Sequence, residues 1–131
     1  MESNKVIKKQ QKDCLTKLEQ NIEMNSKLQA YIKYLKYESE INALYSLDSF
    51  QIKILNELIY AQEKGINLCV SDLMALKHIA SPATIHSGIK KLLAKELISL
   101  RTVSDTRIKY VELTPLGLER FKNLSKVAPK N

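Results

Sequence analysis

The stretch from 105 to 117 carries the clearest chemical signal in this chain. It reads DTRIKYVELTPLG, which predicts a charged turn, an alternating strand and the start of a helix. Asp105 stands two residues before Arg107, so its carboxylate can hold the guanidinium in place, and Lys109 adds a further positive charge. An Arg at the tip of such a hairpin can enter a narrow minor groove of DNA, where the potential is most negative. The alternative is a plain hairpin whose local ion pair contributes little.

A predicted helix from about Pro82 to Lys95 supplies a second polar surface, with Ser81 as its N-cap. Apolar residues gather on one side of its helical wheel: Ile85, Ile89, Leu92 and Leu93. The opposite side, which His86 flanks, is small, hydroxylated and basic: Ala83, Thr84, Ser87, Lys90, Lys91 and Ala94. Small side chains let a helix enter the major groove, where hydroxyls and Lys can bind base edges or phosphates. An ordinary amphipathic surface helix has the same pattern, so this helix alone does not decide the function.

The positive charge of the chain is concentrated around these two surfaces. The net charge at pH 7 is +7. Residues 77–109 set seven basic side chains against the acidic Glu96 and Asp105, a balance of +5: Lys77, Lys90, Lys91, Lys95, Arg101, Arg107 and Lys109. A local positive field of this kind attracts phosphate backbones. A solvated surface that serves only solubility is the other interpretation of the charge.

Composition indicates a small globular protein. The 131 residues suit one domain with an extension, and 44% of them are hydrophobic, which is enough for a core. No apolar run approaches the roughly 20 residues of a membrane helix, and no apolar signal segment is visible at the N-terminus, so we expect a cytoplasmic protein. Cys14 and Cys69 lie far apart and match no metal spacing, which favours reduced thiols.

An enzymatic function is the weakest interpretation of the sequence. It contains no metal-binding cluster, no Gly-rich phosphate loop and no plausible pairing of a nucleophile with a base. Its only histidines, His78 and His86, both fall near the predicted DNA-binding surface. We therefore expect neither catalysis nor a metal nor a cofactor.

The rest of the chain supplies the elements that would position these residues. We expect helices over 14–46 and from Asp48 or Ser49 to about Lys64, a short strand over 66–70, and a helix that Ser71 caps. After the helix from Pro82 come strands over 97–103 and 108–113 and a last helix that Thr114 caps. This order predicts a mainly α fold with a small β-hairpin (α+β), a winged helix-turn-helix with an N-terminal helical extension. Residues 1–46 would form the extension and 47–131 the DNA-binding domain.

The predicted extension carries an apolar stripe of its own, made of Met24, Leu28, Tyr31, Ile32 and Leu35. Most of it follows Asn25 and Ser26, where two helices are expected to meet or one helix to kink, because Ser26 and Gln29 fit a capping box. An apolar stripe must be buried against something. A second copy of the chain and the chain's own winged helix are equally good candidates, so the stripe is a candidate dimerisation element.

The C-terminal part of the chain resembles the MarR family of bacterial transcriptional regulators. The family's wing pattern, D-x-R-x-x-x-V-x-L-T-x-x-G, is matched without a gap by Asp105, Arg107, Val111, Leu113, Thr114 and Gly117. The runs 81–85 and 91–98 resemble the family's reader helix and its passage into the wing, and the resemblance covers roughly residues 48 to 124. Glu96 stands where the family usually has Gly, and Leu100 where a basic residue is common. The chain also leaves little room for the family's long C-terminal dimerisation helix.

The resemblance implies a homodimer on a pseudo-palindromic operator. Thr84, Ser87, Lys90 and Lys91 would face the major groove and Arg107 the minor groove. Many members of the family release DNA when a small phenolic ligand binds or a cysteine is oxidised. The resemblance therefore also implies a possible small-molecule effector, whose identity is unknown. The full set of residues expected to bind DNA is Ser81, Ala83, Thr84, His86, Ser87, Lys90, Lys91, Arg101, Arg107 and Lys109, with Asp105 as support for the wing.

These observations together predict a sequence-specific transcriptional regulator that binds double-stranded DNA in the bacterial cytoplasm and is thereby associated with the nucleoid. The alternative is a winged-helix interaction or assembly module of a replication, plasmid or phage complex, with weak or nonspecific DNA binding, because a fold does not fix a function. Exposed aromatic residues on the reader helix would favour this alternative, whereas Lys90 and Lys91 favour DNA.

Overall fold

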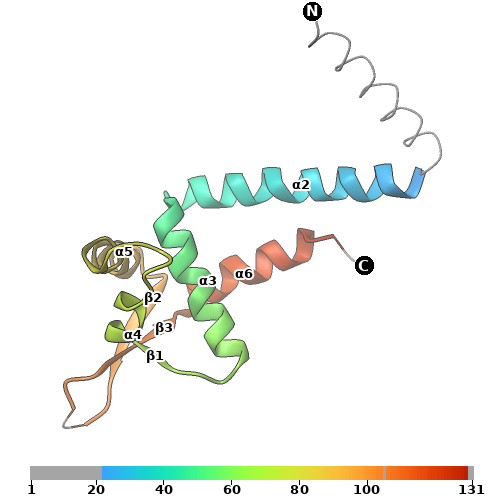
Figure 1. Cartoon of the computed structure of the whole chain (residues 1–131). Helices are drawn as coiled ribbons and strands as arrows, with labels where there is room; N and C mark the ends of the chain where they lie inside the picture. The colour runs from blue at the N-terminus through green and yellow to red at the C-terminus, as the bar shows by residue number, and fades with distance from the viewer. Residues whose placement is uncertain (1–21, 105, 130–131) are drawn as a thin grey trace, which may run out of the picture.

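The computed structural model describes residues 22–104 and 106–129. Its elements, shown in Figure 1, are α2 (Ile22–Leu44), α3 (Ser49–Glu63), β1 (Leu68–Cys69), α4 (Val70–Met74), α5 (Pro82–Ala94), β2 (Ile98–Thr102), β3 (Lys109–Leu113) and α6 (Pro115–Val127). α4 and α5 form the expected helix pair, and β2 and β3 form the wing. Cys14, Asp105 and the helix expected before Ile22 lie outside the described residues.

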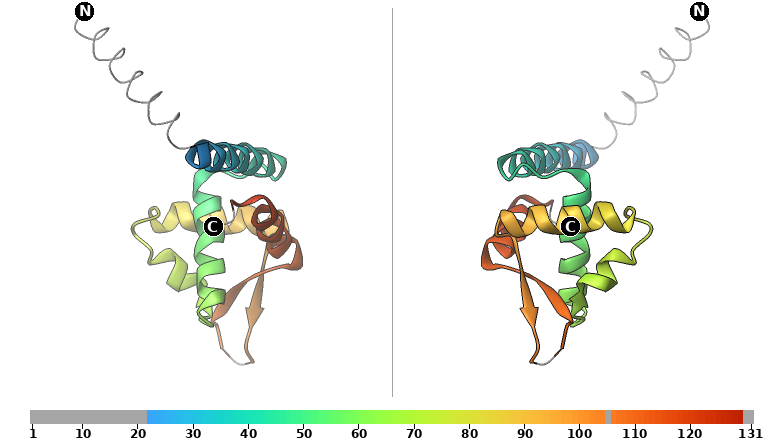
Figure 2. Two further views of the ribbon diagram at one scale, coloured as in Figure 1. Left: turned by 90° about the vertical axis from the view of Figure 1, so that its right-hand side faces the viewer. Right: turned by 90° about the vertical axis from the view of Figure 1, so that its left-hand side faces the viewer.

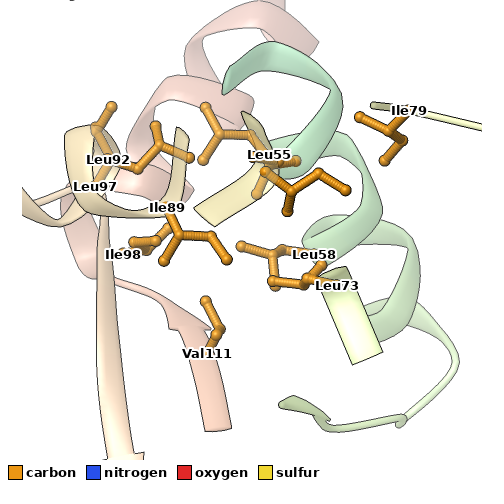
Figure 3. Close-up of a cluster of buried hydrophobic side chains, with 11 residues drawn as sticks. Leu55, Leu58, Leu73, Ile79, Ile89, Leu92, Leu97, Ile98 and Val111 are labelled. Atoms are coloured by element: carbon orange, nitrogen blue, oxygen red, sulfur yellow. The ribbon is translucent and has the colours of Figure 1, made fainter. Parts of the chain in front are cut away.

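One apolar core joins α3, α4, α5 and the sheet (Figure 3). Its buried side chains are Ile54, Leu55 and Leu58 of α3, Leu73 of α4, Ile79 of the following turn, Ile85, Ile89 and Leu92 of α5, and Leu97, Ile98 and Val111 of the wing. Removing such side chains from water is the main favourable contribution to folding. The predicted apolar side of α5 is therefore its core side, with Leu93 only partly buried at its edge.

Three helices begin at their predicted caps. The capping hydrogen bonds run from Gln51 N to Asp48 Oδ1 (2.8 Å), from Thr84 N to Ser81 Oγ (3.3 Å) and from Gly117 N to Thr114 Oγ1 (3.1 Å). Each side-chain oxygen satisfies a first-turn amide that has no partner within its helix. The starts of α3, α5 and α6 are thus determined by local sequence.

The backbone after α5 packs tightly against the start of α6. Glu96 adopts φ +61°, in the left-handed region that Gly enters most easily, and its carbonyl accepts a hydrogen bond from Thr114 Oγ1 at 2.6 Å. Thr114 N donates to Leu97 O at 3.1 Å. A Cβ at Gly117 would lie only 2.2 Å from Leu97 O. The T-x-x-G part of the wing pattern therefore reflects a backbone-to-backbone contact that only a glycine permits.

The segment before α4 differs from the prediction. The strand expected over 66–70 is limited to Leu68–Cys69, and α4 already begins at Val70, so Ser71 is not its N-cap. The cause is Asp72, whose carboxylate accepts a hydrogen bond from Cys69 N at 3.0 Å and closes the first turn early. The two residues of β1 pair with β3, which gives an antiparallel sheet of order β1-β3-β2.

α2 is one helix from Ile22 to Leu44, so the chain does not divide into two helices near Asn25 and Ser26. Good helix formers surround Ser26, and their propensity outweighs a capping signal of this kind. α2 packs on α6. It lies across one end of the molecule, opposite the end that carries the turn of the wing (Figures 1 and 2).

Candidate nucleic-acid interface

The outward side of α5 presents the residues that the sequence assigned to it. Five of them are exposed: Ala83, His86, Ser87, Lys90 and Lys91. Thr84 is half-buried, and its hydroxyl lies 3.0 Å from Ser81 Oγ. Thr84 and Ser81 therefore both take part in the N-terminal cap of the helix, while Ser87 and the two lysines extend from the middle of α5 into solvent.

α5 also lies very close to α3. Gly88 is buried, and a Cβ at this position would lie 2.8 Å from Cδ1 of Ile54. A larger residue would push the two helices apart or displace Ile54. Gly88 thus fixes the depth at which α5 sits, and with it the position of the exposed side.

A cleft of about 610 Å³ separates α5 from the wing. Its lining combines apolar and basic side chains, together with the start of α4: Ile89, Leu93, Leu100 and Ile108, then His86, Lys90, Arg107 and Lys109, and also Cys69, Val70 and Ser71. Lys90 and Lys109 form no ion pair with any described residue. The fold therefore brings basic side chains of the reader helix and of the wing to one opening. Leu100, which departs from the family pattern, is one of the apolar lining residues.

Arg101 differs from the other basic residues of the wing. Its Nε donates to Glu112 Oε1 at 2.5 Å, and its guanidinium lies 5.0 Å from the centre of the Tyr110 ring. The pairing of β2 with β3 sets Arg101 opposite Tyr110, which brings both partners within reach. Arg101 is exposed, but its charge already has an intramolecular partner.

Lys91 has an acidic neighbour at the base of α3. Its Nζ lies 4.0 Å from Oδ2 of Asp48, the residue that caps α3. Burial raises the pKa of the Asp48 carboxyl, but hydrogen bonds from Gln51 and the charge of Lys91 outweigh this effect and hold the pKa below its usual value. Lys91 therefore contributes to the positive field with a nearby compensating charge, unlike Lys90.

A second cavity, of about 330 Å³, lies between α2, α3 and α6, and its wall includes Arg120. Arg120 is only 1% exposed, and its Nη2 donates to Asn42 Oδ1. Its Nε and Nη1 have no hydrogen-bond partner among the described residues. Burial lowers the pKa of this guanidinium, and the nearby Glu38 opposes that effect. Sequence reasoning missed Arg120, although it occupies the same helical face as Leu116 and Leu124.

The apolar stripe of α2 lies away from the core. Its described side chains are 42–50% exposed: Leu28, Tyr31, Ile32 and Leu35. The Met24 side chain is outside the described part of the chain. The chain's own winged helix therefore does not cover this stripe.

Residues 22–104 and 106–129 contain neither a metal-binding cluster nor a membrane-spanning helix. Within them, no three His, Cys, Asp or Glu side chains gather in a way that could hold a metal ion. No helix in this part of the chain is long and apolar enough to span a membrane.

Comparison with known proteins identifies the fold. No protein-family model matches the sequence, and no curated protein matches it. The structure resembles that of the YusO protein from Bacillus subtilis, with a TM-score of 0.53 and 23% identity over 86% of this chain and 76% of YusO. This likeness, at the level of fold, confirms the winged helix-turn-helix that the resemblance to MarR regulators implied.

Two further solved structures align less closely, each with a TM-score of 0.49. One is the adhesin competence repressor AdcR from Streptococcus pyogenes, 22% identical over 79% of this chain and 71% of its own. The other is the heme sensor protein PefR from Streptococcus agalactiae in complex with heme, 17% identical over 83% of this chain and 73% of its own.

Proposed function

We propose that this protein is a sequence-specific transcriptional regulator that binds double-stranded DNA in the bacterial cytoplasm. The observation that carries the proposal is the cleft between α5 and the wing, which Lys90, Arg107 and Lys109 line together. A basic opening beside an exposed helix of small side chains fits a DNA backbone, with the helix in the major groove and the wing beside it.

The test is a selection of randomised duplex DNA with the purified full chain at physiological salt. An enriched inverted repeat with half-sites about one helical turn apart would support the proposal and supply the operator. Arg107→Ala should then weaken binding to the enriched duplex about tenfold. Lys122→Ala is the matched control, because Lys122 is an exposed lysine of α6 outside the cleft. A pool without enrichment would favour the interaction-module alternative.

The proposed regulator is a homodimer whose protomers meet through the apolar stripe of α2. Four of its five residues, Leu28, Tyr31, Ile32 and Leu35, are described and are exposed in the single chain. An exposed apolar surface favours association in water. The same stripe on a second copy of the chain, related by twofold symmetry, can bury it. Sedimentation of the full chain measures this directly: a dimer at micromolar concentration is expected, and a monomer would contradict the assignment.

A small anionic molecule is the effector that we propose for the cavity beside Arg120. The favouring observation is a buried guanidinium with two nitrogen atoms that have no hydrogen-bond partner in the described part of the chain, in a wall that Tyr34, Tyr60 and Phe121 also form. A carboxylate satisfies such a guanidinium, and aromatic walls accept a ring. Benzoate should raise the melting temperature of the wild-type protein, whereas neutral benzamide should not. Arg120→Met should remove the benzoate effect, and equal responses to both compounds would exclude this site.

A further inference from the structure

The C-terminal end of α5 is attached to the corner between α2 and α3. Lys95, the C-cap residue of α5, donates from Nζ to Ser46 O at 2.7 Å and to Gln51 Oε1 at 2.6 Å. These partners lie 49 and 44 residues away in sequence, so the contact joins separate parts of the fold. Lys95 is half-buried, unlike Lys90 and Lys91 on the same helix.

Both acceptors are themselves held in place. Gln51 is only 2% exposed, and its backbone amide binds the Asp48 carboxylate. Ser46 adopts φ +53° at the end of α2, where Ser46 N donates to Ala43 O at 3.0 Å and Leu47 N donates to Asn42 O at 2.9 Å. The ammonium group of Lys95 is thus bound to two oxygens that cannot easily move.

We propose that Lys95 is a positioning residue for the reader helix, which fixes the C-terminal end of α5 against the α2–α3 corner and does not itself bind DNA. The effect of Lys95 on DNA binding rests on the proposed function, because the helix that Lys95 positions is the one assigned to the major groove. Lys95 belongs by sequence to the basic region around α5, yet the structure gives its charge a different use.

The geometry of α5 explains why this end matters. Ile85, Ile89 and Leu92 pack α5 into the core, and Gly88 touches α3 in the middle of the helix and sets its depth. Lys95 adds a polar attachment about seven residues beyond Gly88, roughly 10 Å by helical rise, and this attachment restrains the last turn of α5 against tilting. The tilt of α5 determines whether Ser87 and Lys90 reach a groove together, and misplacement by about 1 Å is costly in any preorganised site.

A role as a phosphate contact is the competing interpretation of Lys95. To reach a phosphate, the Lys95 ammonium would have to leave Gln51 Oε1. Gln51 is buried, and its Oε1 accepts no other hydrogen bond from the described residues. An unsatisfied buried acceptor is unfavourable, and the new contact would have to offset this cost. Lys90 has no such attachment, which makes it the matched lysine for comparison.

The first experiment is amide hydrogen exchange of the full chain without DNA, for the wild type, Lys95→Met and Lys90→Met. Lys95→Met should accelerate exchange about fivefold or more in residues 45–52 and in the last turn of α5, and Lys90→Met should change neither. Gln51→Glu should have the opposite effect on exchange. A carboxylate should bind the Lys95 ammonium more tightly and so slow exchange of the same amides. Unchanged exchange in both Lys95→Met and Gln51→Glu overturns the proposal.

The second experiment measures the affinity for a labelled duplex enriched by selection, as a function of salt concentration. Lys95→Met should weaken binding about tenfold without changing the salt dependence, because no phosphate contact is lost. Lys90→Met should reduce the slope of log K against log salt by about one. An equal reduction of the slope in Lys95→Met would identify Lys95 as a phosphate contact. If the wild type binds no duplex, the proposed function fails, while hydrogen exchange still decides how Lys95 acts.

Discussion

α2 and α5 both leave one side exposed to solvent, but the two sides have opposite chemistry. The α2 stripe is apolar, with Leu28 and Tyr31 both 50% exposed, whereas the outward side of α5 has small residues and two lysines. An exposed apolar stripe is stabilised by excluding water and therefore favours a protein partner. Small and basic residues gain little from exclusion of water and favour a phosphate-bearing partner. The two exposed sides, on α2 and on α5, thus favour two different kinds of binding partner.

The largest effect should follow from placing charge on the α2 stripe. The double variant Leu28→Asp and Leu35→Asp should convert the proposed dimer to a monomer in sedimentation, since two carboxylates cannot be buried against an apolar copy. Its affinity for an inverted repeat should fall about a hundredfold or more, because each monomer must then bind its half-site without the help of a linked second chain. The circular dichroism spectrum should remain that of the wild type, and loss of helix signal would show that the stripe supports the monomer fold instead.

A charge reversal on α5 tests the other side of the comparison. Lys90→Glu should weaken DNA binding by about tenfold to a hundredfold, because it replaces attraction to the backbone by repulsion. The oligomeric state should not change. Lys122→Glu on α6 has the same charge difference and serves as the control in fluorescence anisotropy titrations. A similar loss in both variants would mean that only net charge matters and that α5 has no special role.

Within the wing, Arg101 and Arg107 should behave differently. Arg101→Ala should change DNA affinity less than about twofold, because its guanidinium already pairs with Glu112 and stacks on Tyr110. Its loss should instead lower the melting temperature slightly. If Arg101→Ala weakens binding as much as Arg107→Ala, then Arg101 leaves its partners when DNA binds and the two residues act together.

The smallest effect concerns the acid side of the stability profile. The folded-state pKa of Asp48 lies below its unfolded value, so its contribution to stability is present above the unfolded pKa and is lost as the pH falls through the folded one. In urea titrations, Asp48→Asn should lose less stability than the wild type between about pH 5 and pH 2. The difference should be small because Asp48 is nearly half exposed. Parallel profiles would show that other carboxylates dominate.

Features that depend on neighbouring residues in sequence were predictable. The caps at Asp48, Ser81 and Thr114 act on amides three residues away, and the core side of α5 follows from its own periodicity. The early start of α4 was missed because Asp72 was not recognised as a partner for Cys69 N. A local signal existed in this case and was outweighed by the more familiar serine cap.

Features that depend on distant residues were not predictable in the same way. Arg120 has the spacing of a core residue, but only the packing of α2 on α6 explains why a guanidinium is buried there. Lys95 looked like one more member of a basic cluster, and its partners become adjacent only in the folded chain. The sequence identified which residues carry charge, whereas the fold determines which charges remain available to a ligand.

The two-residue strand β1 has a consequence for how a ligand can be accommodated. By pairing with β3, it attaches the wing to the segment that leads directly into α4, so the wing and the helix pair form one body with a set separation. If the cleft is the proposed DNA-binding site, its width is then largely set before a duplex binds. On the proposed function, a duplex would have to match that width by its own shape, and base steps that narrow or bend at little cost would be preferred even where no side chain touches a base.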